Sequence, residues 1–308
     1  MPDTVIVTGC EKNYFLMACT LLHTLKRWCP DVPVYVLDFG LDVAQKRFLA
    51  DRTIVLDRPS DLPPHLDPFL YKAAIAKYLR PIDWSTIVWL DCDMIAVGPI
   101  RQRLNEVVTE MERNSIEVAA CLDISETIGA FLAGGYKAEP FVAAIRKQDI
   151  SPSSRYFNVG IVICRSHEFV DAWTALADRI ADHVNFDQNL FNLVVHARKH
   201  SILTLPRHEW NVHGSMLASI RAASDPIYGT KLTTNDHEQA VLILHPTSSR
   251  KEDIVQMGAA EIGTHRVPGH LFFCRTPAAF NVQRTVLSDF LTQSIGELRS
   301  SGLTLPAT

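Results

Sequence analysis

Two aspartates stand one residue apart in the apolar run Ile87–Val97, and their spacing suits cation chemistry. An isolated ionised carboxylate is costly to take out of water. Asp91 and Asp93 must therefore be exposed at a strand end, hydrogen-bonded or neutralised by a cation. Two carboxylates spaced in this way can bind one divalent ion and leave coordination positions for diphosphate oxygens. The alternative, two solvated carboxylates that cap the turn after a strand, stays open on this motif alone.

His245, which follows the apolar segment Val241–Leu244, could complete such a site. A histidine at the tip of an apolar strand is usually a core or rim residue. Beside two aspartates, however, a neutral imidazole can serve as a third ligand, and mixed nitrogen and oxygen donors suit Mn²⁺ more than Mg²⁺. The sequence therefore predicts a Mn²⁺ site, with Mg²⁺ as the alternative, made by Asp91, Asp93 and His245.

The elements that must position these residues alternate between strands and helices in the first part of the chain. Short β-branched or apolar runs predict strands, and apolar residues at helical spacing predict helices. The predicted strands are Thr4–Thr8, Val34–Leu37, Thr53–Leu56 and Thr86–Leu90, and the predicted helices are Tyr14–Trp28, Val43–Ala50 and Leu70–Leu79. This alternation indicates a mostly parallel sheet flanked by helices. Ligands bind beyond the carboxyl ends of the strands in such sheets, which is where the two aspartates fall.

The rest of the chain has a mixed pattern, which we assign to the same continuous domain. The predicted helices are Arg101–Arg113, Glu168–His183 and Gln188–Ala197, and the predicted strands are Met94–Val97, Val118–Leu122, Phe157–Cys164, Ile202–Leu205 and Ala240–Leu244. Apolar residues recur at near-helical spacing in Phe280–Leu298, which favours a packed or interface helix there.

Composition and charge exclude several classes of protein. The 308 residues are 47% hydrophobic and 21% charged, which is typical of a globular protein with a core. A formal net charge of −4 gives no overall reason to bind nucleic acid. The N-terminus does not resemble a secretory signal and no run is long enough to span a bilayer, so we expect a cytoplasmic protein. The seven scattered cysteines include no Cys-x-x-Cys pair and are interpreted as reduced core thiols.

Four motifs follow one another in a specific order along the chain. They are Leu90–Asp93 after an apolar strand, Tyr156–Gly160 at the start of a later strand, Phe186–Asn189 at the start of a helix, and His245. This order resembles the retaining glycosyltransferases of family eight, which have the GT-A fold, and the similarity runs from about Thr4 to Lys251. The resemblance implies a Rossmann-like α/β fold in a single domain at 1–254, with a nucleotide half at about 1–98 and an acceptor half at about 99–254. Residues 255–308 would form a C-terminal extension with an amphipathic helix.

The turn after the first predicted strand is similar to the nucleotide-binding segment of that family. The resemblance implies that Thr8 and Gly9 line the nucleotide site, where the missing side chain of glycine lets the backbone approach the ligand. It also implies that Glu11 accepts a hydrogen bond from the base, while Asn13 and Tyr14 hold the uridine, with Tyr14 stacked on it. The family often has Asp at the position of Glu11. The alternative is an ordinary helix-start turn with Asn13 as the cap.

Further residues of the donor site follow from the same resemblance. Lys72 stands where these enzymes place a cation that contacts the donor phosphate or sugar. Asp91, Cys92 and Asp93 together would line the donor site, and Asn158 matches a residue that lines the sugar. A solvated surface lysine is the alternative interpretation of Lys72.

The resemblance also assigns the residues of the reaction itself. Retention is usually explained in this family by departure and attack on the same face of the sugar. Gln188 would support the developing oxocarbenium ion, Asp187 would line the sugar or cap its helix, and Lys251 would neutralise the leaving diphosphate.

The segment after His245 keeps only part of the family pattern. Ser248 replaces a glycine and Glu252-Asp253 replace Pro-Trp, whereas the spacing from the histidine to Lys251 is preserved. The geometry of a phosphate-binding loop is therefore altered here.

Four further positions have two interpretations each. Asp123 either faces a sugar or simply ends the strand Val118–Leu122. His208, Trp210 and Asn211 resemble the Leu-Pro segment that precedes Trp/Tyr-Asn in the family. We expect mainly structural roles there, with Trp210 in packing rather than as a sugar platform.

These features predict a metal-dependent retaining glycosyltransferase that transfers a hexose from a UDP-sugar to a carbohydrate or other hydroxyl acceptor. The C-terminal extension could contact a membrane surface or a second subunit. A sugar-phosphate nucleotidyltransferase uses similar chemistry but normally has a Gly-rich loop after the first strand, where this chain has only Gly9. A catalytically inactive GT-A module that binds or scaffolds is the third possibility, and the altered segment after His245 favours it.

Overall fold

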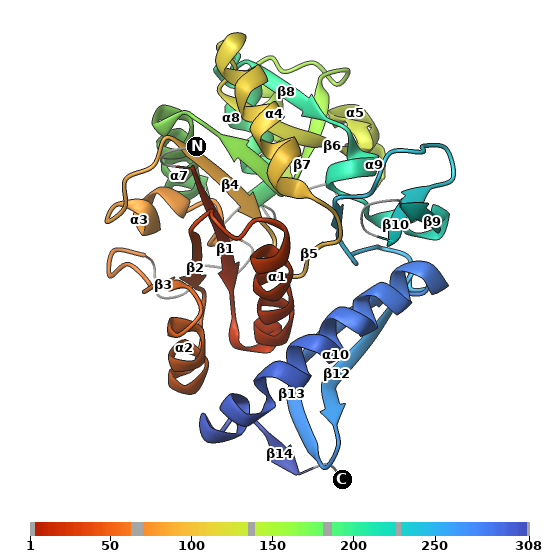
Figure 1. The fold of residues 1–308 in the computed structure, drawn as a ribbon. Coiled ribbons are helices and arrows are strands. Elements are labelled where there is room, and N and C mark those ends of the chain that lie inside the picture. Colours follow the sequence, from red (N-terminus) through yellow and green to blue (C-terminus); the bar gives the residue numbers. More distant parts are fainter. Residues whose placement is uncertain (1–3, 63–69, 135–138, 181–186, 226–228, 307–308) are drawn as a thin grey trace. The chain divides into compact units, whose positions relative to one another are not determined.

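The computed structural model of the protein describes residues 4–62, 70–134, 139–180, 187–225 and 229–306. The predicted fold class is confirmed, because a mostly parallel central sheet of seven strands is flanked by helices (Figure 1). The hydrogen-bonded strand order is β3 (Ile54–Leu56), β2 (Val34–Asp38), β1 (Thr4–Cys10), β4 (Thr86–Leu90), β7 (Arg155–Cys164), β6 (Val118–Thr127) and β8 (Ile202–Leu205).

The chain forms two compact units, each built from several segments, and each is described by itself. Unit 1 comprises Met1–Ile6, Asp57–Trp89 and Asn105–Leu205, and unit 2 comprises Val7–Leu56, Leu90–Leu104 and Pro206–Thr308. The units interleave along the chain. The boundaries expected near residues 98 and 254 assume that each part is continuous in sequence. They stay predictions.

Unit 1 contains the antiparallel pair of β6 and β7 and the parallel pair of β6 and β8. Its helices are α3 (Ile75–Leu79), α5 (Ile128–Ala133), α6 (Glu139–Lys147), α7 (His167–Ile180) and α8 (Asp187–Ala197). Helices α3 and α8 pack on α7, and α8 also packs on β7. Buried apolar residues cover most of α8, including Leu190, Phe191 and Val194, so its polar first turn is held against the sheet.

Unit 2 is organised around α1 (Phe15–Trp28), which packs against α10 (Pro277–Ser300) and β13 (His265–Cys274). Helix α1 is buried on all sides from Phe15 to Leu22, and it ends at Trp28, two residues before a proline that cannot continue it. Helix α10 lies alongside β13 and its antiparallel partner β12 (Ile254–Ile262) (Figure 1). Phe290 and Leu298 of α10 are buried with Phe15 and Phe48 in one core cluster, which confirms the expected packed C-terminal helix.

The remaining elements of unit 2 are short. They are η1 (Lys12–Tyr14), α2 (Val43–Ala50), β5 (Ile95–Ala96), α9 (Arg207–Trp210), η4 (Gly214–Ser219), β9 (Ile220–Asp225), β10 (Gly229–Thr234), β11 (Ile243–Leu244) and β14 (Leu305–Pro306). Helix α4 (Ile100–Arg113) contributes residues to both units. Helix α2 begins with a reciprocal capping box, in which Asp42 Oδ1 accepts from the Gln45 N–H at 2.8 Å.

Several predicted boundaries differ from the structure. The predicted helix Leu70–Leu79 is α-helical only from Ile75, because the preceding backbone forms tighter bonds such as Ile75 N–H to Lys72 O. The predicted strand Ala240–Leu244 is reduced to the two residues of β11. The predicted end of the helix Glu168–His183 lies outside the described residues.

All seven cysteines are free thiols, and Cys92 is the one that is not fully buried. Among the helices that the structure describes, none combines the length and apolar character required to cross a bilayer.

Candidate functional site

Asp91, Asp93 and His245 come together in unit 2. One potential ligand atom of each lies within 4.8 Å of those of the other two, and His245 Nε2 lies 3.3 Å from Asp93 Oδ1. Octahedral coordination with bonds of ~2.1 Å separates neighbouring ligand atoms by ~3.0 Å and opposite ones by ~4.2 Å. The 4.8 Å bound is slightly wider than the larger of these separations, so a small inward movement of the side chains would let all three bind one small divalent cation.

Backbone pairing explains how residues so far apart in the sequence meet. The two aspartates lie in the turn after β4, where the Met94 N–H donates to Asp91 O at 3.0 Å. Strand β5 follows that turn and pairs antiparallel with β11, so that Leu244 lies opposite Ile95. Because His245 directly follows β11, this pairing carries its imidazole to the turn.

Burial distinguishes this group from two solvated turn caps. His245 is buried, both aspartates are half-buried, and the side chain of Asp93 is only 18% exposed. His245 Nδ1 lies 3.0 Å from Oδ1 of the fully buried Asn211. The imidazole is thus held on one side by an amide and faces a carboxylate on the other.

Cys92 stands between the two aspartates but belongs to the core. Its side chain packs against the apolar cluster of unit 2 that contains Cys10. A side-chain hydrogen bond with Cys10, together with burial, raises the pKa of the Cys92 thiol well above its usual value. The predicted donor contact of Cys92 stays a prediction.

Tyr14 already has aromatic neighbours. Its ring stacks on Phe272 at a centroid distance of 5.9 Å and lies 5.6 Å from His270. Burial, followed by the negative charge of Asp93, raises the pKa of Tyr14 to about 12. The phenol is therefore neutral at physiological pH. It lies close enough to Asp93 for the charge of that carboxylate to raise its pKa.

The other residues of the turn after β1 differ in how well their surroundings agree with the predicted roles. A Cβ at Gly9 would lie 2.1 Å from ring atoms of Phe39, so packing alone explains the glycine. Thr8 is fully buried, and its hydroxyl has no hydrogen-bond partner among the described residues. Asn13 is exposed within η1 and donates to Glu11 Oε1 at 3.4 Å. The interpretation of Asn13 as a helix cap is wrong, because α1 starts after Tyr14 without a side-chain cap.

A second polar group lies in unit 1 around Asp123. Asp123 Oδ2 accepts from Asn158 Nδ2 at 3.3 Å and from Gln188 Nε2 at 3.2 Å, while Oδ1 accepts from the Ser125 N–H at 3.0 Å. Asp123 does not end the strand, because β6 continues to Thr127, and its carboxylate orients two of the predicted sugar-site amides.

A bulge in β7 supplies backbone groups to this network. Cys121 pairs with Asn158 but Ala120 pairs with Val162, so the residues between them leave the ladder. The freed Val159 N–H donates to Gln188 Oε1 at 3.4 Å, and the Val159 C=O accepts from Lys72 Nζ at 3.1 Å.

Lys72 and Asp187 form a buried ion pair in unit 1. Lys72 Nζ lies 3.0 Å from Asp187 Oδ2, and Lys72 is only 8% exposed. The interpretation of Lys72 as a solvated surface residue is therefore wrong. Asp187 is the first residue of α8, and its Oδ1 accepts from the Gln188 N–H at 2.8 Å, so it also satisfies a backbone donor at the helix start.

Asn192 was not identified from the sequence. Fully buried one turn after Gln188, it donates to the Gln188 C=O and also bonds both backbone groups of Phe157, each at 2.8 Å. An asparagine inside an apolar helical run was the available signal, because a buried amide needs partners.

The segment after His245 forms a closed loop. Ser248 Oγ donates to Asp253 Oδ2 at 2.7 Å and accepts from the Arg250 N–H at 3.1 Å. Lys251 is exposed in the turn before β12. Within the described chain, no hydrogen bond or ion pair joins Lys251 to the three residues of the metal group.

His208 and Trp210 have surroundings that agree with structural roles. Trp210 is buried, and His208 stacks on His237 at a centroid distance of 3.6 Å with the rings 7° from parallel. Burial, and then the neighbouring His237, lowers the pKa of His208.

No family model and no curated protein matches this sequence. Its fold, however, matches solved glycosyltransferases of the GT-A type. The galactosyltransferase LgtC in complex with donor and acceptor sugar analogs is 15% identical, with a TM-score of 0.58 over 96% of this chain and 99% of that chain. The glycosyltransferase GlyE of Streptococcus pneumoniae TIGR4 is 14% identical, with a TM-score of 0.51 over 99% of this chain and 66% of that chain. The chain therefore has the fold of GT-A glycosyltransferases.

Proposed function

We propose that the chain is a metal-dependent retaining glycosyltransferase that transfers a hexose from a UDP-sugar to a hydroxyl acceptor. The observation that carries the proposal is the convergence of Asp91, Asp93 and His245, whose potential ligand atoms all lie within 4.8 Å of one another. The GT-A fold supports it, since LgtC, a galactosyltransferase of that fold, was solved with donor and acceptor sugar analogs.

In this proposal, the first role of unit 2 is to bind the nucleotide. Mn²⁺ or Mg²⁺, held by Asp91, Asp93 and His245, would supply positive charge to the donor diphosphate. Glu11, Asn13 and Tyr14, together with the backbone near Thr8 and Gly9, would bind the uridine. Lys251, which is exposed, would neutralise the leaving diphosphate.

The polar network of unit 1 is proposed to bind the sugar. The Gln188 amide donates to Asp123 and accepts from Val159, so both of its ends are held in one orientation. Its carbonyl oxygen would support positive charge that develops at the anomeric carbon. Asn158 and the Lys72–Asp187 pair would contact sugar hydroxyls or phosphate.

A catalytically inactive GT-A binding module is the second candidate. The bond from Ser248 to Asp253 favours it, because it closes the loop at the position where the resembling enzymes have a glycine.

A screen of UDP-sugars for release of UDP tests the proposal. We expect release with Mn²⁺ and none with a chelator, and we expect Asp93→Asn to lower turnover by about 100-fold or more. Asp31→Asn, at an exposed position of the same unit, is the matched control. Full turnover by Asp93→Asn would refute the metal assignment, and a β-linked product from an α-linked donor would refute retention. Metal-enhanced UDP binding with no transfer from any donor would support the inactive module.

A further inference from the structure

We propose that Asn211 is a positioning residue of the metal group, which keeps the His245 proton on Nδ1 and leaves Nε2 available as a ligand. The inference rests on the metal site of the proposed function. It adds to that function a residue for which the sequence indicated only a structural role.

The side-chain geometry supports this role. His245 Nδ1 lies 3.0 Å from Asn211 Oδ1, and His245 Nε2 faces Asp93 Oδ1 at 3.3 Å. A neutral imidazole has one donor nitrogen and one acceptor nitrogen. Both neighbours of the ring, the Asn211 amide oxygen and the Asp93 carboxylate, can only accept. When a cation binds at the carboxylates, Nε2 must offer it a lone pair, and Asn211 Oδ1 accepts the proton that then belongs on Nδ1. The reversed tautomer would place a proton where a cation must bind.

The backbone holds this arrangement in register. Val212 and Leu244 form a parallel bridge, and the His245 N–H donates to Val212 O at 3.1 Å. The same two segments are joined on either side of this bridge by Leu242 N–H to Glu209 O and by Gly214 N–H to Thr247 O, both at 2.8 Å. Asn211 is therefore carried beside His245 by the ladder rather than by side-chain packing alone.

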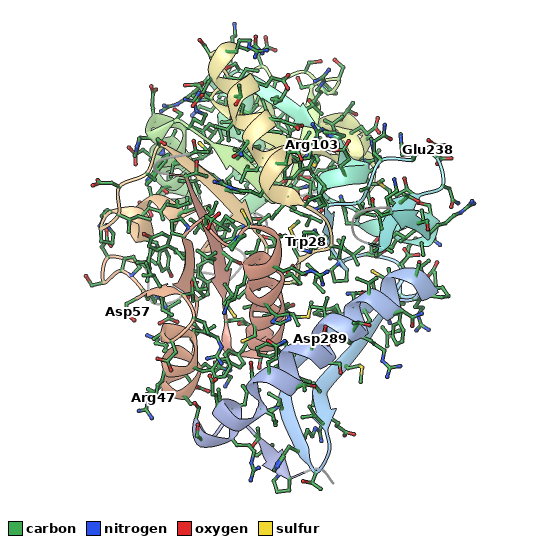
Figure 2. The ribbon with its side chains drawn as sticks, in the orientation of Figure 1. Trp28, Arg47, Asp57, Arg103, Glu238 and Asp289 are labelled. Carbon is green, nitrogen blue, oxygen red and sulfur yellow. The ribbon has the colours of Figure 1, made fainter. Side chains whose placement is uncertain are left out.

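An ion pair stabilises one end of this set of backbone hydrogen bonds. Arg103 of α4, labelled in Figure 2, donates to Glu209 Oε2 through Nε at 3.2 Å and Nη2 at 3.1 Å. Both Asn211 and His245 are buried, with exposures of 0% and 5%. Bulk water is therefore a poor substitute for the amide oxygen if that oxygen is removed.

Nitrogen NMR of the imidazole, at one concentration of diamagnetic Mg²⁺ that saturates the wild-type chain, tests the tautomer directly. At alkaline pH we expect the wild-type His245 to show a protonated Nδ1 and an unprotonated Nε2. In Asn211→Leu, which keeps the approximate volume and removes the acceptor, we expect a mixture of tautomers. A wild-type ring protonated on Nε2 would overturn the proposal.

Mn²⁺ affinity, measured from the free-ion electron paramagnetic resonance signal, provides the second readout. Loss of such a partner typically weakens metal binding about 10- to 100-fold, and we expect this for Asn211→Leu. Asn211→Asp retains an acceptor and should bind Mn²⁺ no more weakly than the wild type. Asn189→Leu, the same change at a fully buried asparagine of unit 1, should leave Mn²⁺ affinity unchanged.

Wild-type affinity in Asn211→Leu, or weak binding by a folded Asn211→Asp, would contradict the proposal. If Asn211→Leu does not fold, the aspartate variant and the wild-type tautomer decide. If the wild-type chain does not bind Mn²⁺ at all, the metal site of the proposed function fails. The role of Asn211 fails by itself if the wild-type chain binds the ion with its imidazole protonated on Nε2, or binds it no more tightly than Asn211→Leu does.

Discussion

At the scale of single residues, Lys72 shows how one side chain can serve both stability and ligand binding. Its ammonium is bonded to Asp187 and to the Val159 C=O, and it lies 5.3 Å from the Trp89 ring centroid. Removing one partner of a buried pair leaves the other charge in a poorly solvated environment. The pair therefore constrains the fold of unit 1 whether or not a donor is bound.

Lys72→Met should consequently lower the free energy of unfolding by about 3–5 kcal/mol. Lys72→Met combined with Asp187→Asn should recover much of this loss, because the neutral amide can still accept from the Gln188 N–H. Urea denaturation followed by circular dichroism measures both. A single Lys72→Met variant as stable as the wild type would show that the pair is not buried in solution.

At the scale of elements, α10 is integrated into the core of unit 2. Phe290 is 3% exposed and meets His23 and Phe48 edge-on. The C-terminal extension is thus part of the fold of unit 2, and a contact with a membrane or a second subunit stays a prediction for its exposed residues.

Phe290→Ala should destabilise the chain by about 3–5 kcal/mol, since it leaves a cavity in the core cluster. Thr292→Ala, at an exposed position of the same helix, should change stability by less than about 0.5 kcal/mol. The two variants can be compared in one set of urea titrations. Equal stability of both would mean that α10 does not pack on α1 in solution.

The sequence predicted best those elements in which neighbouring residues alone show the periodic spacing of apolar side chains. The helical spacing of apolar residues in α1 and α10 is of this kind. Strands β12 and β13 were not predicted, because Pro268 and Gly269 interrupt β13 and the ladder is irregular between Met257 and Ala259. Their pairing depends on tertiary contacts that no local pattern contains.

The same division applies to the candidate site. Asp91, Asp93 and His245 could be found from residue type and motif order. The bonds of Asn211 and Asn192 could not, because an amide acquires its role from the partner that the fold supplies. The bulge at Val159 was also hidden, since Phe157–Cys164 has the continuous apolar pattern of a regular buried strand.

At the scale of the whole molecule, the two units carry different chemistry. Unit 2 holds the carboxylates and the imidazole that are proposed to bind a cation and a nucleotide, and unit 1 holds the hydrogen-bonded amides proposed to bind a sugar. Because both units are assembled from interleaved segments, neither proposed role can be assigned to one continuous half of the sequence.

The coupling between cation and nucleotide has a thermodynamic requirement. If Mn²⁺ tightens UDP binding by a given factor, UDP must tighten Mn²⁺ binding by the same factor. Reciprocal tightening would show that Mn²⁺ and UDP bind at coupled sites. Two independent sites would leave both affinities unchanged.

Calorimetric titration of UDP with and without Mn²⁺ tests the central claim most directly. We predict that Mn²⁺ tightens UDP binding by about tenfold or more, a coupling of about 1.4 kcal/mol, and that Asp93→Asn abolishes the difference. Equal UDP affinity in the presence and absence of Mn²⁺, or no UDP binding by the wild-type chain, would contradict the account.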